Sequence, residues 1–427
     1  MTLLAFTDAR VIDPASGRDG PSTLLVRDGM IAGVAEAGDP IPADAEVLRH
    51  PDRLIVPGLI DTRVFSGEPG GEHRETIASL GAAAAAGGVT TAIVMPDTDP
   101  VIDEAAIVSF VRETAELHSR IALHPAAALT VGLRGEALAE IGLMLEAGAI
   151  AASQGARPIS DGSVLRRALS YARDFDIVVD LPPIDASLSS GVMNAGFQAT
   201  LLGLAGVPPE AETIALLRDL ELAQATRARL NVAGLSLGRS LAHVRRAKSE
   251  ADVTASATIN HLSLNEIDVG DYRSYFRLDP PLRSEEDRLA LVDGLADGTI
   301  DMVTSCHDPH DADTKRVPFG DAATGAIGLE TLLAALLRLH HSGSVPLSRL
   351  IEVVTSAPAR RFGLEAGTLR TGAVADFAIV DVDTPWVVKE DEIVSASRNT
   401  AFEGARFQGR VMETWKVGRR VFALDDR

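Results

Sequence analysis

Short apolar runs alternate with helix-forming segments through the middle of this 427-residue chain, and this alternation most constrains its fold. Eight runs have the length of a buried strand: Leu59–Phe65, Thr91–Met95, Ile121–Leu129, Ala149–Ser153, Ile177–Asp180, Leu230–Gly234, Val253–Ile259 and Asp301–Ser305. Between two of them, Val164–Ala172 places apolar residues at i, i+1, i+4, i+5 and i+8, which is one face of a helix. The segments Glu212–Ala228 and Thr331–Leu339 are also helix-forming. Eight strand–helix units in one block predict an α/β fold with a (β/α)8 TIM barrel.

Both ends of the chain have a different pattern, in which short apolar runs such as Thr23–Val26 and Phe377–Val380 alternate with turn residues. This spacing is typical of short antiparallel strands. Neither end alone buries much apolar surface, so we expect the two ends to meet in one small β-sandwich domain. The predicted domains are the barrel at 55–363 and a composite β-domain made of 1–54 and 364–427.

The charge balance and the cysteine content exclude several classes of function. A formal net charge of −20 would repel nucleic acid and anionic membranes over most of the surface. It also disfavours an anionic substrate unless a local cationic pocket exists. The apolar stretch Leu80–Met95 contains Gly87-Gly88 and Thr90-Thr91, so it fits a helix end before a buried strand and not a membrane span. The single cysteine, Cys306, excludes an internal disulfide and is typical of the reducing cytoplasm, where we expect the protein.

In barrels of this kind the reacting groups lie at the carboxyl ends of the strands. A catalytic zinc needs about three nitrogen, oxygen or sulfur ligands that converge on it. Most of the predicted strand ends offer Phe, Leu, Gly or Arg, which do not bind a metal cation. Only the last strand is followed by a group of ligand-type residues, Cys306-His307-Asp308-Pro309-His310.

Several motifs, in the same order and over nearly the whole chain, resemble those of the bacterial dihydroorotases, which are metal-dependent amidohydrolases. They include Val56-Pro57-Gly58-Leu59-Ile60-Asp61, Glu68-Pro69-Gly70, Met95-Pro96-Asp97-Thr98, Gly191-Val192-Met193-Asn194, Asp279-Pro280-Pro281-Leu282-Arg283 and Ser397-Arg398-Asn399-Thr400. The resemblance implies an amidohydrolase-type barrel that hydrolyses a C–N bond in a cyclic amide with bound zinc.

The metal ligands of that family are missing here. The family's two strand-one histidines fall on Arg63 and Phe65, and its bridging acid falls on Gln154 or Gly155. Its strand-five histidine falls on Leu181, or on Asp180 if the register shifts by one residue. Its strand-six histidine falls on Gly234, and its strand-eight aspartate falls on Cys306. By this alignment no catalytic position is intact, and we expect neither zinc nor another cofactor. The simpler interpretation of these positions is structural: Arg63 pairs with Asp61 or Glu68, and the apolar side chains of Phe65 and Leu181 plug the space left by the metal.

The substrate-binding positions of the family are altered as well. Its carboxylate-binding arginine falls on Gly67, its two asparagines fall on Asp97 and Asp279, and only His310 is retained. Dihydroorotate and carbamoyl aspartate are anions, so the loss of one cation and the gain of two carboxylates favour repulsion.

We therefore predict a non-catalytic dihydroorotase-like protein of pyrimidine biosynthesis. The resemblance implies that it scaffolds or regulates the catalytic chain of aspartate transcarbamoylase, and we expect it to form a homo-oligomer, with a dimer as the simplest case. One alternative is an active cyclic amidohydrolase with a relocated or single-metal site around Cys306, His307 and His310. Another is a regulatory subunit that binds a small molecule through Arg63, Asp97, Asp279, His307 and His310.

Overall fold

In the computed structural model, eight parallel strands form a barrel in which the order of the strands follows the chain. They are β6 (Leu59–Val64), β7 (Val89–Val94), β8 (Ala122–Ala128), β9 (Ala151–Ser153), β10 (Val178–Leu181), β13 (Arg229–Val232), β14 (Val253–Thr258) and β15 (Met302–Thr304). The sheet closes where Val64 pairs with His307 and the Phe65 N–H donates to the His307 carbonyl at 2.8 Å. Each predicted run overlaps one of these strands, so the predicted (β/α)8 barrel is confirmed.

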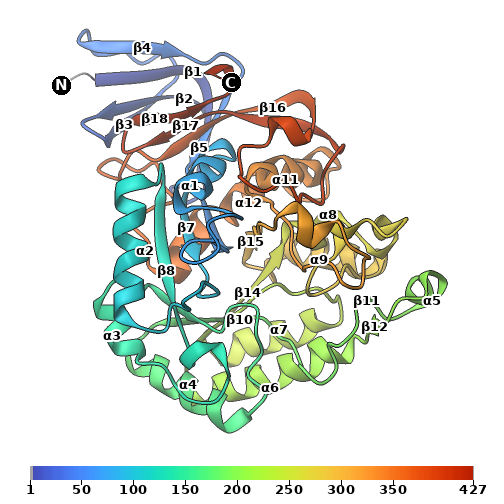
Figure 1. Ribbon diagram of the computed structural model, residues 1–427. Helices are drawn as coiled ribbons and strands as arrows, with labels where there is room; N and C mark the ends of the chain where they lie inside the picture. The colour runs from blue at the N-terminus through green and yellow to red at the C-terminus, as the bar shows by residue number, and fades with distance from the viewer. Residues whose placement is uncertain (1–2, 427) are drawn as a thin grey trace.

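Helices connect the strands, and most of them cover the outside of the barrel (Figure 1). They are α1 (Ile77–Ala86), α2 (Ala105–His118), α3 (Ile141–Glu146), α4 (Gly162–Asp174), α5 (Phe197–Leu202), α6 (Glu210–Thr226), α7 (Ser240–Glu250), α8 (Ile259–Ser263), α9 (Glu285–Ala296), α10 (Ala312–Lys315), α11 (Leu332–His341), α12 (Leu347–Glu352) and α13 (Ser356–Phe362). Asp161 caps the N-terminus of helix α4: its carboxylate accepts from the Ser163 and Val164 N–H groups and so satisfies two free donors of the first turn. The apolar face predicted for α4 is buried against the barrel.

The two ends of the chain join in one eight-stranded sheet beside the barrel (Figure 1). Its strands are β1 (Leu3–Asp13), β2 (Arg18–Arg27), β3 (Met30–Glu36), β4 (Ala45–Arg49), β5 (Leu54–Pro57), β16 (Phe377–Val387), β17 (Arg406–Lys416) and β18 (Arg419–Ala423). The structure describes residues 3–426, so Met1, Thr2 and Arg427 of the predicted β-domain lie outside the described part. Within 3–426, no helix combines the length and the apolar character that crossing a membrane requires.

The small sheet folds over its own core. Strands β5 and β16 separate β1 from β17, so a flat sheet would hold β1 and β17 about 14 Å apart. Yet the ring of Phe6 on β1 lies 4.9 Å, centroid to centroid, from Trp415 on β17. The two chain ends therefore share an aromatic core within one continuous sheet, in place of the two facing sheets of the predicted β-sandwich.

Alternation along the barrel strands separates an inner from an outer set of side chains. The inner apolar cluster includes Phe65, Met95, Val178 and Met302, whereas Leu181 belongs to the outer core between strands and helices. Between β10 and α6, the chain forms a projecting arm in which β11 (Met193–Asn194) and β12 (Gly206–Val207) flank α5 (Figure 1).

Candidate functional site

A cavity of about 70 Å³, here called the mouth cavity, lies at the carboxyl ends of the barrel strands. Its lining includes Arg63 at the end of β6, Phe65 just after β6, Gly234 after β13, Asn260 after β14, and Cys306 after β15. A second cavity of about 160 Å³, here called the outer cavity, shares Phe65 and Asp308 with it. Sites that enclose drug-sized ligands are several times larger than the mouth cavity, so only a small group fits inside it.

An ion pair between Arg63 and Asp180 lies at the centre of the barrel. Arg63 Nη1 is 2.6 Å from Asp180 Oδ2, and Arg63 Nη2 donates to the Gly155 carbonyl at 2.6 Å. The second Asp180 oxygen accepts from Asn231 Nδ2 at 2.6 Å. Both charged side chains are nearly inaccessible to water, at 6% and 2%. Burial alone would lower the pKa of Arg63, but the nearby anionic groups, Asp180 first, raise it above its ordinary value.

The partner of Arg63 is therefore Asp180, and the structural interpretation that paired Arg63 with Asp61 or Glu68 is wrong. The carboxylate of Asp61 instead accepts from the backbone N–H groups of Arg63 and Ser305, at 3.1 and 3.0 Å, and from the Thr304 hydroxyl. These bonds join β6 to β15 where the barrel closes. Burial raises the pKa of Asp61 despite these bonds. Glu68 accepts from the Ile77 N–H at the start of α1.

The residues at the barrel centre do not fit a zinc ion. Within residues 3–426, no group of three or more His, Cys, Asp or Glu side chains is arranged to hold a metal. A guanidinium lies beside the buried carboxylate of Asp180, and a permanent cation there repels Zn²⁺. The alternative ligand set of Cys306, His307 and His310 also does not form, because His307 Nε2 faces Glu75 at 3.5 Å.

The remaining positions that replace the family's metal ligands have different surroundings. Gln154 is fully buried and hydrogen-bonds the Thr130 hydroxyl at 2.8 Å, outside the residues that line the mouth cavity. Leu181 packs between the strands and the outer helices, so the interpretation of Leu181 as a plug of the barrel mouth is wrong. Phe65 does contact the inner cluster and lines both cavities. Gly234 lines the mouth cavity with a backbone φ of +67°. A Cβ added at this position would meet only the Thr258 methyl group, at 3.8 Å.

Four of the five predicted ligand-binding residues surround the two cavities. Arg63 and Asp279 line the mouth cavity, and Asp97 and His310 line the outer one. His310 Nε2 lies 2.7 Å from the Thr324 carbonyl and 3.3 Å from Asp308. The fifth, His307, is buried elsewhere: its Nδ1 accepts from the Gly328 N–H at 3.3 Å.

Cys306 has no activated thiol. Loss of bulk water around the side chain raises the pKa of Cys306 to about 12, and the carboxylates of Asp308 and Asp61 add to this rise although the Arg63 guanidinium opposes it. The thiolate is the nucleophilic form of cysteine, and at neutral pH almost none of it is present. The geometry therefore gives no support to Cys306 as a nucleophile.

Sequence reasoning missed Asn231 and Asn260, which the fold places inside the barrel and at its mouth. Asn231 is completely buried and links Asp180 to the Thr254 hydroxyl, which donates to Asn231 Oδ1 at 2.9 Å. Asn260 is 2% exposed and lines the mouth cavity. The available signal was a polar residue within or just after a predicted apolar strand, because such a residue is buried only with a partner or a function.

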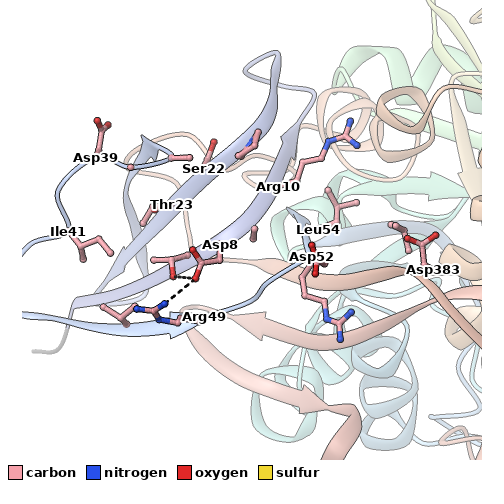
Figure 2. Close-up of a pocket in the computed structure, with 18 of the residues that line it drawn as sticks. Asp8, Arg10, Ser22, Thr23, Asp39, Ile41, Arg49, Asp52, Leu54 and Asp383 are labelled. Carbon is pink, nitrogen blue, oxygen red and sulfur yellow. Dashed lines mark hydrogen bonds and ion pairs between the residues drawn. The ribbon is translucent and has the colours of Figure 1, made fainter.

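A larger groove of about 760 Å³ lies away from the barrel mouth, along the small sheet (Figure 2). Its three arginines all lie in ion pairs: Arg10 is 2.7 Å from Asp19, Arg49 is 3.8 Å from Asp8, and Arg53 pairs with Asp381. Figure 2 shows Asp8 and Arg49 joined in this way, with Asp39 and Asp383 on other parts of the wall. Because each of the three arginine charges is already paired with a carboxylate, the groove does not select an anionic ligand.

Comparisons with known proteins agree on the family. The family described as "Dihydro-orotase-like" matches residues 52–237, and the family described as "Amidohydrolase family" matches residues 207–421. The chain is 42% identical to a dihydroorotase of Anaeromyxobacter sp. (strain K) over 98% of both chains. It is 41% identical to a dihydroorotase of Syntrophotalea carbinolica over 99% of this chain and 100% of that one.

Solved structures agree on the fold. The L-hydantoinase (dihydropyrimidinase) of Arthrobacter aurescens superposes with a TM-score of 0.89 at 24% identity, over 99% of this chain and 96% of that one. The dihydropyrimidinase of Brevibacillus agri superposes with a TM-score of 0.84 at 18% identity, over 99% of this chain and 95% of that one. At these identities the likeness concerns the barrel and the small sheet.

Proposed function

Because the chain belongs to the dihydroorotase family of the amidohydrolases, we propose that it is a member of the pyrimidine pathway that keeps the family's fold without its catalysis. One observation carries the proposal: the barrel centre holds the Arg63–Asp180 ion pair at 2.6 Å. An internal guanidinium supplies a fixed positive charge there, but unlike a metal it has no open coordination position for a water molecule.

The charges around the mouth also support a non-catalytic role. Asp97, Asp279 and Asp308 line the two cavities, and the Arg63 charge is already balanced by Asp180. An anionic cyclic amide would meet these carboxylates without the arginine that the family uses. Repulsion by these carboxylates at short range opposes the binding of such an anion.

We further propose that the protein binds no zinc or other cofactor and that its role is structural. By resemblance, its partner is the catalytic chain of aspartate transcarbamoylase. The chain keeps the complete barrel and the small sheet that both of its ends build. This supports a scaffolding role, because a protein that binds a partner needs its outer surface and the core that supports that surface. Gel filtration of the mixed proteins tests the partner: we expect the two chains to co-migrate, and separate elution at micromolar concentration rejects the assembly. Gel filtration of the protein alone tests the proposed homo-oligomer, for which we expect elution at twice the monomer mass.

Catalysis and metal content are tested together on protein purified without chelators. We expect less than stoichiometric zinc and no hydrolysis of dihydroorotate above the background rate. The control is the Arg63→His, Phe65→His double variant, which restores two imidazole ligands but not the other ligands, and which we also expect to be inactive. Turnover by the unmodified protein, lost on exposure to a chelator, would reject the proposal.

The second candidate is an active cyclic amidohydrolase, and the full-length identity of about 42% to proteins named dihydroorotase favours it. The His310 and Asp308 side chains, 3.3 Å apart at the outer cavity, are the acid–base pair that such an activity would use. In that case the His310→Gln variant loses at least about tenfold in kcat/KM. Equal rates in the variant and the unmodified protein would reject this candidate.

A further inference from the structure

The projecting arm between β10 and α6 carries no ionisable side chain. From Ala186 to Pro209 the chain contains no Asp, Glu, Lys, Arg or His, although the whole protein has a formal net charge of −20. The other long uncharged run, 76–96, forms α1 and β7 and is mostly buried in the barrel. The arm instead extends away from the barrel, with α5 at its outer end (Figure 1). A protruding element without any charge is unusual on a soluble protein, whose surface normally carries many charged side chains.

Four large apolar side chains on this part of the molecule are exposed, and we call them the arm patch. Phe197 and Leu201 lie one helical turn apart on α5 and are 76% and 65% exposed. On the loop 266–272, Ile267 is 64% exposed and Tyr272 is 47% exposed. Their exposed area is on the order of 500 Å², which matches the largest apolar patches of monomeric proteins, and such patches are often binding sites.

Hydrogen bonds hold the arm and the loop against each other. The Tyr272 hydroxyl donates to the Leu202 carbonyl at the end of α5, at 2.8 Å. At the base of the arm, the Asn194 amide donates to Glu266 at 2.7 Å and accepts from Arg283 Nη1 at 3.0 Å. The arm patch is therefore preorganised, which lowers the entropy cost of binding to it.

The two halves of the arm patch differ in charge. The α5 half is uncharged, whereas Glu266, Asp268 and Asp271 flank Ile267 and Tyr272 in the sequence. Two copies of the chain that met through these acidic loops would repel each other. A two-fold arrangement avoids this repulsion when the uncharged α5 of each copy covers the loop of the other copy.

We propose that a second copy of this chain covers the arm patch, so that the protein is a two-fold dimer joined through its projecting arms. Phe197 and Leu201 of each copy pack against Ile267 and Tyr272 of the other. Two chains of net charge −20 meet with the least repulsion at an uncharged surface. The arm patch supplies roughly half of the about 800 Å² that each partner contributes to a stable interface, and the uncharged remainder of the arm surrounds it.

This inference rests on the homo-oligomer proposed above and names its surface, and it requires nothing about zinc or catalysis. Sedimentation velocity of the full chain over a range of concentrations tests it. We expect a reversible dimer that the Leu201→Ser variant weakens at least about thirtyfold, because a two-fold interface loses the apolar side chain from both copies. The Ile267→Ser variant changes the other half of the arm patch and has the same expectation.

The matched control is Leu117→Ser. Leu117 is 77% exposed on α2, which lies on the opposite side of the barrel from the arm, so its loss should leave the dimer unchanged (Figure 1). Because all three side chains are exposed in the single chain, the dilute, monomeric variants should unfold at the same denaturant concentration as the unmodified protein.

Three results would overturn the proposal. A monomer at every concentration rejects the homo-oligomer and the arm interface together, and leaves the proposed lack of catalysis untouched. A dimer of unchanged affinity in both Leu201→Ser and Ile267→Ser shows that the copies meet elsewhere, and rejects the arm interface alone. Equal weakening by the Leu117→Ser control would reject a specific role of the arm patch.

Discussion

The Arg63 guanidinium is the residue on which the interior of the barrel depends. It contacts Asp180, the Gly155 carbonyl and Met95 Sδ, and so connects residues that follow or belong to β6, β7, β9 and β10. Such a pair is costly to bury, and its geometry and extra hydrogen bonds must offset the loss of water from both ions. Once the pair has formed, removal of either side chain leaves the other as an unpaired buried charge.

Removal of one member should therefore cost more than removal of both. We expect Arg63→Met or Asp180→Leu alone to destabilise the protein by about 3–5 kcal/mol, because each leaves an uncompensated buried charge. The double variant Arg63→Met, Asp180→Leu should be more stable than either single variant. Heat unfolding of the four proteins measures this, and additive losses in the double variant would contradict a coupled pair.

His261 makes stability depend on pH in the acid range. Burial lowers the pKa of His261 to about 4, helped by the Arg283 charge, and the ring is held neutral between the Thr258 hydroxyl at 2.7 Å and the Pro280 carbonyl at 3.1 Å. In the unfolded chain the ring takes a proton at about pH 6.5, so between pH 6.5 and 4 the unfolded state binds more protons. Stability is complete above pH 6.5 and falls by about 3 kcal/mol as the pH drops to 4.

The His261→Gln variant tests this dependence, because its amide N–H can still donate to the carbonyl oxygens but does not titrate. We expect the difference in unfolding free energy between pH 6.5 and 4 to be about 3 kcal/mol smaller in the variant. Identical acid profiles would show that other groups govern acid unfolding.

At the level of elements, the barrel closes through side chain to backbone bonds as well as through the sheet ladder. Strands β6 and β15 share few direct ladder bonds, and the buried Asp61 carboxylate bridges them. The junction between these two strands is therefore stabilised by a carboxylate that water does not reach.

The Asp61→Ala variant should weaken the junction between β6 and β15. Loss of the carboxylate leaves the Arg63 and Ser305 N–H groups without a partner, and each buried orphan donor costs about 1–3 kcal/mol. We expect faster amide hydrogen exchange in β6 and β15 than in β8 and β9. Asp61→Asn keeps an acceptor oxygen and serves as the control with a smaller effect. Uniform exchange across the barrel would contradict a local role of Asp61 at the junction between β6 and β15.

For the whole molecule, the two chain ends stabilise one another. The ring of Phe6 lies 4.9 Å from both Phe377 and Trp415, which enter the small sheet more than 350 residues later in the chain. This core holds residues of both terminal segments, and other residues of the same sheet, such as Val56 and Val380, belong to the core of the barrel. Each end of the chain is therefore held by the other end and by the barrel.

We expect Phe6→Ala to destabilise the protein by about 3–5 kcal/mol, because it leaves a cavity in a packed aromatic core. The shift of tryptophan fluorescence on unfolding should occur at a lower denaturant concentration in the variant than in the unmodified protein, since Trp415 lies in that core. The matched control is Phe197→Ala on the projecting arm, where the side chain is 76% exposed and the change should stay within about 0.5 kcal/mol. Equal effects of the two substitutions would contradict a core that joins the ends.

The sequence by itself determined the eight barrel strands, the helices α4, α6 and α11, the meeting of the two ends and the family. These features follow from hydrophobic periodicity and from ordered motifs, both of which are local properties of the chain. It also located the altered ligand positions Arg63, Phe65 and Cys306 at strand ends, because strand direction in a barrel fixes that edge.

Only the tertiary structure decided which side chains meet there. The partner of Arg63 is Asp180, 117 residues away, and no local pattern favours it over the nearer Asp61. A shift of one residue exchanges the inner and outer faces of a strand, so whether Asp180 or Leu181 faces the barrel depended on the register of β10 against its neighbours. The exposure of Phe197 and Leu201 on the projecting arm is likewise visible only in the fold, because the sequence of α5 does not show which of its apolar side chains find a partner.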